Sequence, residues 1–366
     1  MIEKGRISAL QMALLIYANP VSTAMLTLPG LSFKYAEHDM WLAPIWASLP
    51  GFLVVYIIWQ LNRLYPNQTL IQYTPHILGK IAGKAVGFVY LFFFLYNCGA
   101  SLRMYGEFLI GVFLNRTPLV LVMGILTLAT TFAVRAGLEV LARLSDMFVP
   151  IIFLLWLIIV LLLIPELEVK NMLPIMENGI TPSLKAAIIV APFFELYFYI
   201  FTLLPYLSDR KQGLKWGMIS VVAVMVTLVM TNLAALLLFG GITGSFIFPI
   251  MTVARYISYA DFFENLEAVV MAIWIGGTFI KLGLFQYTVV LNTAQWLNLS
   301  DYKPLTLPFG LLMTLFGIWV FPNLSEQAYA SNLIYPILHP IMLVIIPTAL
   351  LLFALLRKRY QKLKTE

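Results

Sequence analysis

The sequence is poor in charged residues, which make up 11% of its 366 positions, whereas 61% are hydrophobic. A soluble domain of ordinary composition carries roughly 25% charged residues. A chain this long and this apolar cannot cover itself with polar surface in water, so we predict that lipid is its solvent. The shortage of charge therefore excludes an ordinary soluble enzyme or binding domain.

Cysteine and histidine are also scarce, with one Cys and three His in the chain. Cys98 lies in an apolar run and has no second cysteine for an internal disulfide. His38, His76 and His339 lie far apart near the ends of apolar stretches, where we expect them to anchor at the membrane interface. No metal-ligand cluster, hydrolytic triad, carboxylate pair or phosphate loop is recognisable. We therefore expect no enzyme, and neither a metal nor a cofactor.

Apolar stretches are abundant, and each is close to the roughly 20 residues that an α-helix needs to cross a bilayer. Ten stretches qualify, at about 8–33, 41–61, 85–113, 118–134, 144–164, 183–207, 214–239, 266–291, 305–320 and 336–356. A short helix is expected in the loop after the seventh, at 248–257. No linker rich in Ser, Gly or Pro divides the chain, which predicts a single all-α polytopic membrane domain over residues 1–366.

The net charge of +6 is explained by topology and does not require a nucleic-acid partner. Most of the 23 Lys and Arg fall in the segments that ten spans place on the side of the N-terminus. Loops rich in Lys and Arg stay in the cytoplasm. The pattern predicts that both termini are cytoplasmic and that residues 357–366 form a basic cytoplasmic tail.

Prolines interrupt the first and the sixth spans at corresponding positions. Pro20 lies about a dozen residues into the first span, and Pro192 lies partway along the sixth. If residues 8–164 and 183–356 form two five-helix repeats, these are equivalent helices, and paired interruptions point to a transporter-like binding site. Backbone groups freed by a proline are tolerated at membrane depth where they line a cavity or are buried in protein. The alternative is that each proline only bends its helix.

Charged side chains inside spans are the second group of candidates, because they are costly in lipid and usually face a cavity or a partner. Arg103 and Glu107 are four residues apart and share a helix face. They form either part of an outer gate or a structural ion pair. Lys281, in the eighth span, either stands in for a coupling cation or carries a proton, or its long stem reaches the inner interface. Glu195 either binds a ligand ammonium or carries a proton, or it caps the outgoing half-helix.

Several segments, in this order and spacing, resemble one family over nearly the whole chain: Met25–Pro29, Leu144–Pro150, Asn171–Gly179, Phe248-Pro249 and Phe262–Ala268. The sequence resembles the spore germination permeases, the B subunits of the GerA-type nutrient receptors of endospore-forming bacteria. The resemblance implies a ten-helix fold of the amino acid–polyamine–organocation superfamily, which is LeuT-like, with two inverted five-helix repeats and broken helices 1 and 6.

The resemblance also implies a receptor subunit in the inner membrane of the spore, in lipid, assembled with an A and a C subunit. It would bind a small nutrient, an amino acid or a sugar, at the bilayer midplane. The ligand-binding residues implied by matching positions are Ser22, Thr23, Ala24, Pro192, Phe193 and Glu195. Tyr96 and Asn97 in the third span are further candidates. A proton- or cation-coupled amino-acid transporter, or a structural subunit that binds nothing, are the alternatives.

Overall fold

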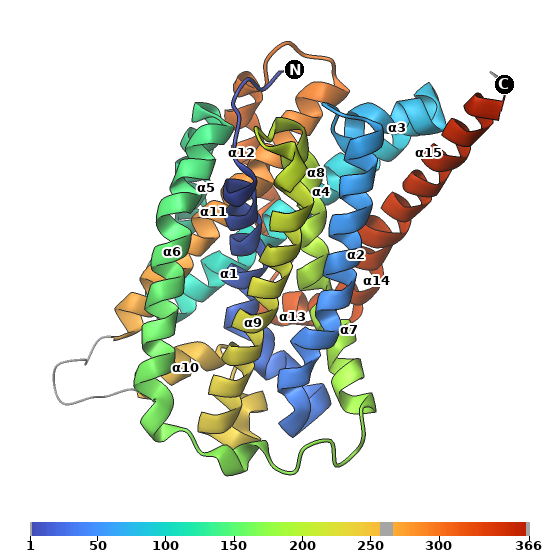
Figure 1. The fold of residues 1–366 in the computed structure, drawn as a ribbon. Coiled ribbons are helices and arrows are strands. Elements are labelled where there is room, and N and C mark those ends of the chain that lie inside the picture. Colours follow the sequence, from blue (N-terminus) through green and yellow to red (C-terminus); the bar gives the residue numbers. More distant parts are fainter. Residues whose placement is uncertain (1, 257–265, 364–366) are drawn as a thin grey trace.

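The computed structural model describes residues 2–256 and 266–363, and these are almost entirely helical. Within these residues the only extended pairing is an isolated bridge between Ile7 and Leu207. Both ends of the chain lie at the same end of the bundle, called here the terminal end (Figure 1). The opposite end, called here the loop end, carries the connection between the two halves of the chain.

The first half of the chain contains five long helices. They are α1 (Ala9–Ala36), α2 (Ala43–Leu64), α4 (Lys80–Val112), α5 (Leu119–Ala136) and α6 (Leu138–Leu163). Short helices join or follow them: η1 (Glu37–Leu42), α3 (Leu70–Leu78), η2 (Ile164–Glu166) and η3 (Val169–Met172). The helix α3, which the sequence did not predict, begins at a capping box formed by Thr69 and Gln72.

The second half repeats this order with more interruptions. Its sixth span consists of α7 (Thr181–Glu195), η4 (Leu196–Tyr199), α8 (Ile200–Leu203) and η5 (Leu204–Tyr206). The next elements are η6 (Arg210–Gln212), α9 (Gly213–Phe239), η7 (Gly240–Ser245), α10 (Pro249–Tyr256) and α11 (Leu266–Trp296). The last are η8 (Lys303–Leu305), α12 (Thr306–Trp319), α13 (Leu324–Leu333), α14 (Tyr335–Pro340), a π-helical turn η9 (Ile341–Ile345) and α15 (Ile346–Leu363).

In the described residues, eight helical segments are long and apolar enough to cross a membrane. The first of these, Ala9–Leu64, contains two helices, since α1 and α2 are joined at the loop end by η1. The pair of α12 and α13, bent by 91°, forms one further candidate. Counting α1 and α2 separately and the bent pair once gives the ten spans that the sequence predicts. The short α10 confirms the helix expected after the seventh span.

The two halves pack against each other reciprocally. The helix α1 packs on α9, and its counterpart α7 packs on α2. In the same way α4 packs on α12, and its counterpart α11 packs on α5. Because α1 runs from the terminal end and α7 runs from the loop end, the halves are inverted relative to each other (Figure 1). This exchange of partners is what two inverted repeats produce.

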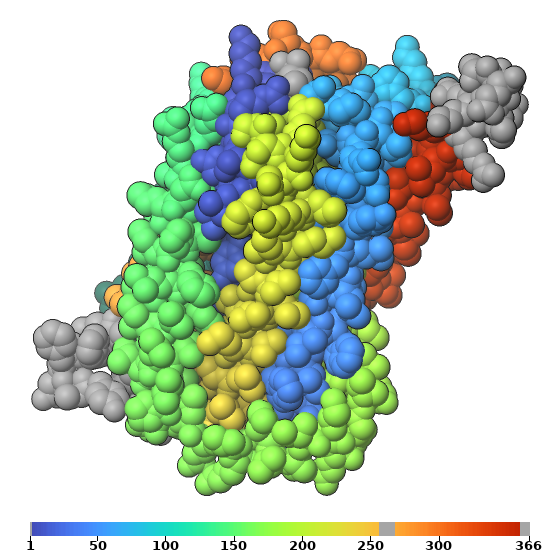
Figure 2. All heavy atoms as spheres, viewed as in Figure 1, coloured from blue at the N-terminus to red at the C-terminus, as the bar shows by residue number. Residues whose placement is uncertain are grey.

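Burial shows which spans are central. In the most apolar 18 residues of the segment Thr181–Tyr206, 78% of the residues are buried within the protein. The corresponding share for Leu138–Glu166 is 28%. The central pair is α1 with α7, whereas α6, α9 and α2 cover one outer face (Figure 2). The many large apolar side chains exposed on α5 and α6 therefore face lipid.

The sequence predicts that prolines break both central helices, but the structure shows a different effect in each helix. The helix α1 continues through Pro20 and Pro29 without an unwound segment, which corrects the predicted break in the first span. Proline has a helix-compatible φ, so the neighbouring helices can hold the geometry although hydrogen bonds are lost. In the sixth span α7 passes through Pro192 and ends at Glu195, where the backbone tightens into the 3₁₀ turn η4. The sixth span is therefore interrupted, and the interruption is a change from α-helix to 3₁₀ helix after Glu195.

The terminal end is closed by the N-terminal segment. The Ile7 N–H donates to the Tyr206 carbonyl (3.1 Å), and the Ser208 N–H donates to the Ile7 carbonyl (2.9 Å). Buried Glu3 accepts a hydrogen bond from the Tyr302 hydroxyl (2.7 Å), and burial raises the pKa of this phenol well above its usual range. These contacts join the start of the chain to the ends of two later spans.

Candidate functional site

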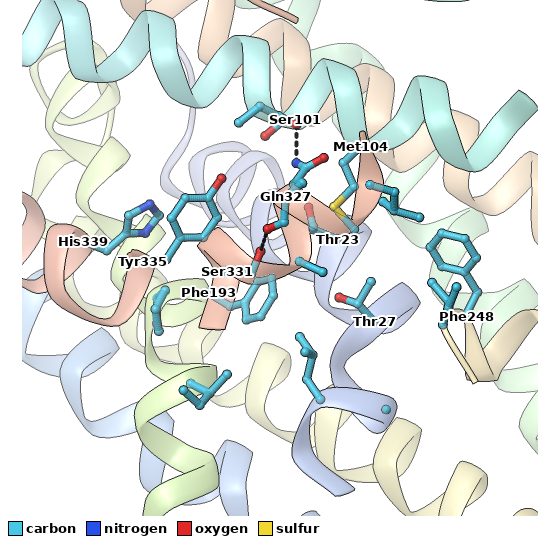
Figure 3. Close-up of a pocket in the computed structure, with 18 of the residues that line it drawn as sticks. Thr23, Thr27, Ser101, Met104, Phe193, Phe248, Gln327, Ser331, Tyr335 and His339 are labelled. Carbon is cyan, nitrogen blue, oxygen red and sulfur yellow. Dashed lines mark hydrogen bonds between the residues drawn. The ribbon is translucent and has the colours of Figure 1, made fainter. Parts of the chain in front are cut away.

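A cavity of about 210 Å³ lies between α1, α4, α7, α11, α13 and α14 (Figure 3). On the same measure one water molecule needs about 10–15 Å³, so the space is large enough for a small organic molecule. Residues 244–248, after α9, complete the wall toward the loop end. Three further cavities in the described residues are smaller, with volumes of about 10, 100 and 10 Å³.

One face of the second half of α1 lines the cavity. Thr23, Thr27, Gly30 and Lys34 follow each other at three- and four-residue intervals, so they share a face. A Cβ on Gly30 would lie 2.7 Å from the carbonyl oxygen of Phe246, so only glycine allows α1 to approach this loop. The exposed Lys34 marks the side on which the cavity approaches the surface.

Lys281 lies deep in the wall, on α11. Its side chain is 2% exposed, and its ammonium group donates to the Thr23 hydroxyl. The ammonium also lies 5.3 Å from the centre of the Phe285 ring. The side chain therefore points inward and ties α11 to α1, which excludes the alternative that it reaches the membrane interface.

The helix α13 forms a wall that the sequence analysis missed. Gln327 donates from Nε2 to the Ala100 carbonyl (2.7 Å), and its Oε1 is buried without a hydrogen-bond partner. Ser331 follows one turn later and also lines the cavity (Figure 3). The capping residue Asn323, which accepts from the Glu326 N–H (2.9 Å), is the sequence signal that marks the start of this helix. The helix lies between the ninth and tenth apolar stretches and is too short and too polar to be predicted as a span.

The helix α14 contributes two rings, which are one turn apart. Tyr335 and His339 stack with 4.9 Å between ring centres, and both line the cavity. His339 is 4% exposed and also meets the edge of Phe93 at 5.6 Å. The expectation that His339 lies at the membrane interface is therefore wrong, because the bend before α14 carries it into the protein interior.

The structure places five of the predicted site residues in the cavity wall: Thr23, Asn97, Pro192, Phe193 and Lys281. Their spans are the first, third, sixth and eighth, as expected. The fold brings these four helices together. Because the family resemblance implied this fold, the sequence could identify candidate residues on the helices that line the cavity.

Three other predicted residues of the first and third spans lie outside the wall. Ser22 borders a separate small void of about 10 Å³ on the other face of α1. Ala24 is completely buried in the helix packing. Tyr96 lies behind the wall, with its ring 6.4 Å from that of Tyr335. Neighbours in sequence diverge by about 100° around a helix, so adjacent candidates cannot all face one cavity.

Glu195 is buried, at 2% exposure, but it does not line the cavity. Its Oε2 atom has no hydrogen-bond partner. It also makes no side-chain cap at the start of η4, which excludes the capping alternative. Glu195 follows Phe193 by two residues, about 200° around the helix, so its carboxyl group points away from the face that Phe193 presents to the cavity.

Arg103 and Glu107 form a close ion pair on α4, with 2.6 Å between Nη2 and Oε1. The same Nη2 donates to the Pro322 carbonyl (2.7 Å), in the bend between α12 and α13. Neither residue lines the cavity. The pair therefore connects α4 to the wall helix α13 from outside the cavity.

Within the described residues, no three His, Cys, Asp or Glu side chains are close enough to hold a metal ion. The motif Phe262–Ala268, used for the family resemblance, falls largely outside the described residues. Another of these motifs, Asn171–Gly179, contributes a hydrogen bond that holds the loop end in place. The Asn171 side chain donates to the Leu237 carbonyl (2.9 Å), which fixes the loop end onto α9.

The fold is that of LeuT-like transporters. The structure matches MhsT in complex with L-phenylalanine with a TM-score of 0.65, covering 93% of this chain and 89% of that one at 14% identity. It matches the nucleobase-cation-symport transporter Mhp1 with bromovinylhydantoin bound, also with a TM-score of 0.65, covering 94% and 78% at 12% identity. The class is therefore a membrane protein of ten helices with two inverted repeats.

Within this class, the chain belongs to the spore germination protein family, whose sequence model matches residues 6–326. Spore germination protein KB of Bacillus subtilis (strain 168) is 28% identical, covering 100% of this chain and 99% of that protein. Spore germination protein YndE of the same organism is 25% identical, covering 98% and 99%. The resemblance read from the sequence motifs is thus confirmed.

Proposed function

We propose that this protein is the nutrient-binding membrane subunit of a spore germinant receptor, and that a small nutrient binds in the cavity between α1 and α7. The observation that carries the proposal is the cavity itself, lined by the two central helices of a transporter fold in a spore germination family. Binding there would shift the packing of α1 and α7 against the other helices, and this change would trigger germination.

The cavity has the composition expected of a small-molecule site, which is mostly apolar with a few fixed polar groups. Its apolar part includes Met104, Phe193 and Phe248, and its polar part includes Thr23 and Gln327 (Figure 3). Two structures of the same fold, MhsT and Mhp1, contain a bound small molecule. An amino acid or a sugar is of suitable size.

The cellular setting is part of the same proposal. We place the protein in the inner membrane of the spore, with the terminal end in the cytoplasm, because that end carries most of the Lys and Arg. We further propose that an A and a C subunit assemble with it and pass the signal on. The role is then binding and signalling, without catalysis and without a metal or cofactor.

A coupled amino-acid transporter is the second candidate, and Lys281 is the observation that favours it. Its buried ammonium bridges α11 to Thr23 on α1, a position from which a charge can control the contact of these helices. Uptake of a labelled nutrient by the purified chain in liposomes would support transport. Germination that needs the A and C subunits, without uptake, would support the receptor.

The test compares two adjacent residues of α1 in spores. Thr23→Val removes a hydroxyl from the cavity wall at nearly constant volume, and Ser22→Ala removes one from the opposite face. We expect Thr23→Val to raise the half-saturating nutrient concentration at normal protein abundance, and Ser22→Ala to leave it unchanged. Equal concentration dependence for both variants and the wild type would remove the cavity from the proposal.

A further inference from the structure

The cavity wall is positively charged. Of the wall residues that the structure describes, the Lys and Arg side chains are Lys34 and Lys281, and none is an Asp or a Glu. Among the described residues, Lys281 has no carboxylate within 4.0 Å, since the ion pairs there involve other side chains. The deepest charge in the cavity is therefore an ammonium group without a counter-ion.

An ammonium buried in this way is costly unless a partner neutralises it. The contacts of Lys281 are the Thr23 hydroxyl and the face of Phe285, both of which are neutral. An ammonium group has three N–H donors, and Thr23 accepts from one of them. The group thus retains N–H donors that an anionic ligand atom in the cavity would satisfy, and such an atom would also favour its charged form.

A second unsatisfied group lies on α13. The Gln327 amide is held in place because its Nε2 donates to the Ala100 carbonyl, and this leaves Oε1 buried without a partner. Gln327 is 5% exposed and lines the cavity (Figure 3). A ligand that offers an N–H or O–H to this oxygen would remove the cost of the unpaired acceptor.

We propose that the ligand is a small carboxylic acid that also carries a hydrogen-bond donor, as an amino acid or a hydroxy acid does. Lys281 binds its carboxylate, and Gln327 Oε1 accepts from its amino or hydroxyl group. The remaining part of the ligand packs on the apolar side chains of the wall. This inference rests on the proposed function and narrows it by excluding neutral sugars as the ligand of this cavity.

The experiment measures binding to the full-length chain in lipid nanodiscs by calorimetry. The probes are the common L-amino acids, D-glucose, and, for each amino acid that binds, its hydroxy-acid and its carboxamide analogue. We expect saturable binding of one or more amino acids, retained by the hydroxy acid and lost with the carboxamide, which lacks the anionic group. This comparison uses the wild-type protein and does not depend on a variant that folds.

The matched variants are Lys281→Met and Lys84→Met. Lys84 is also held against a ring and a carbonyl, both of Trp296, but it lies outside the cavity. Loss of a charge-assisted hydrogen bond predicts that Lys281→Met weakens carboxylate binding by about 10- to 100-fold. Lys84→Met should bind as the wild type does.

The outcomes separate this inference from the proposed function. Binding of D-glucose, or of the acid and the carboxamide equally, would overturn the carboxylate assignment and leave a nutrient-binding cavity in place. Equal affinity of the Lys281→Met and wild-type chains for an amino acid would also overturn it. Binding of none of the probes to the wild-type chain would overturn both proposals.

Discussion

Lys281 and Glu195 are both ionisable side chains buried in an apolar interior, but they face different surroundings. Lys281 lines the cavity and contacts Thr23, whereas Glu195 does not line it and has an unpartnered oxygen. The sequence identifies both as unusual because charge is rare within spans. It does not show which of the two faces the cavity, because the position of the cavity depends on how the helices pack.

Glu195→Gln tests this difference at the residue scale. Burial of Glu195 with its Oε2 atom unpartnered makes the charged form of this side chain costly, so a neutral replacement should stabilise the protein by about 1–3 kcal/mol. Because Glu195 does not line the cavity, the nutrient affinity should stay at the wild-type value. Thermal unfolding in detergent and ligand binding measure the two effects. Lower stability, or a clear loss of affinity, would show that Glu195 has a partner in the functional state.

At the scale of elements, the apolar stretches of the sequence predict the length and order of the helices. They do not predict where the helices bend. The ten predicted spans correspond to helices whose bounds differ from the prediction by up to seven residues. The helix α13 was missed because it is short and polar, and it is stable only where α4 supports it. The Arg103 contact with the Pro322 carbonyl holds the bend before α13 against α4.

A double-mutant cycle on Arg103→Met and Glu107→Met tests this link. The pair is short and largely buried, with side-chain exposures of 9% and 19%, so we expect a coupling energy of about 0.5–3 kcal/mol. The matched control is the exposed pair Glu139 and Arg143, which has the same spacing and a distance of 3.9 Å. Its coupling should be near zero, or at most about 0.5 kcal/mol. Thermal unfolding of the single and double variants gives both values, and equal coupling in the two pairs would contradict the assigned role.

For the whole molecule, apolar length predicted the ten helices, and the family resemblance implied the inverted halves. The shape of the cavity could not be predicted, because it depends on where α13 and α14 turn inward after α12. The orientation in the membrane remains a prediction from the distribution of Lys and Arg. The structure places both termini at one end of the bundle, as this prediction requires (Figure 1).

Cysteine labelling tests the orientation, and the single native cysteine simplifies it. Cys98 is completely buried and should not react in the folded protein. Glu177 is exposed in the connection between the two halves, which lies at the loop end, and Lys211 is exposed in η6, which follows the sixth span and precedes α9. In intact cells that produce the protein, an impermeant maleimide should label Glu177→Cys and should label Lys211→Cys only after permeabilisation. The reverse pattern would place the termini outside.

The most direct test of the central claim is the nutrient concentration for half-maximal germination in spores that carry Ser101→Phe. Ser101 lines the cavity, so a benzyl group there should fill it and raise this concentration by about tenfold or more at normal protein abundance. Ile125→Phe, at a lipid-facing position that is 59% exposed, adds a similar ring outside the cavity and should have no effect. If Ser101→Phe spores respond to the nutrient as wild-type spores do, the nutrient does not bind in this cavity.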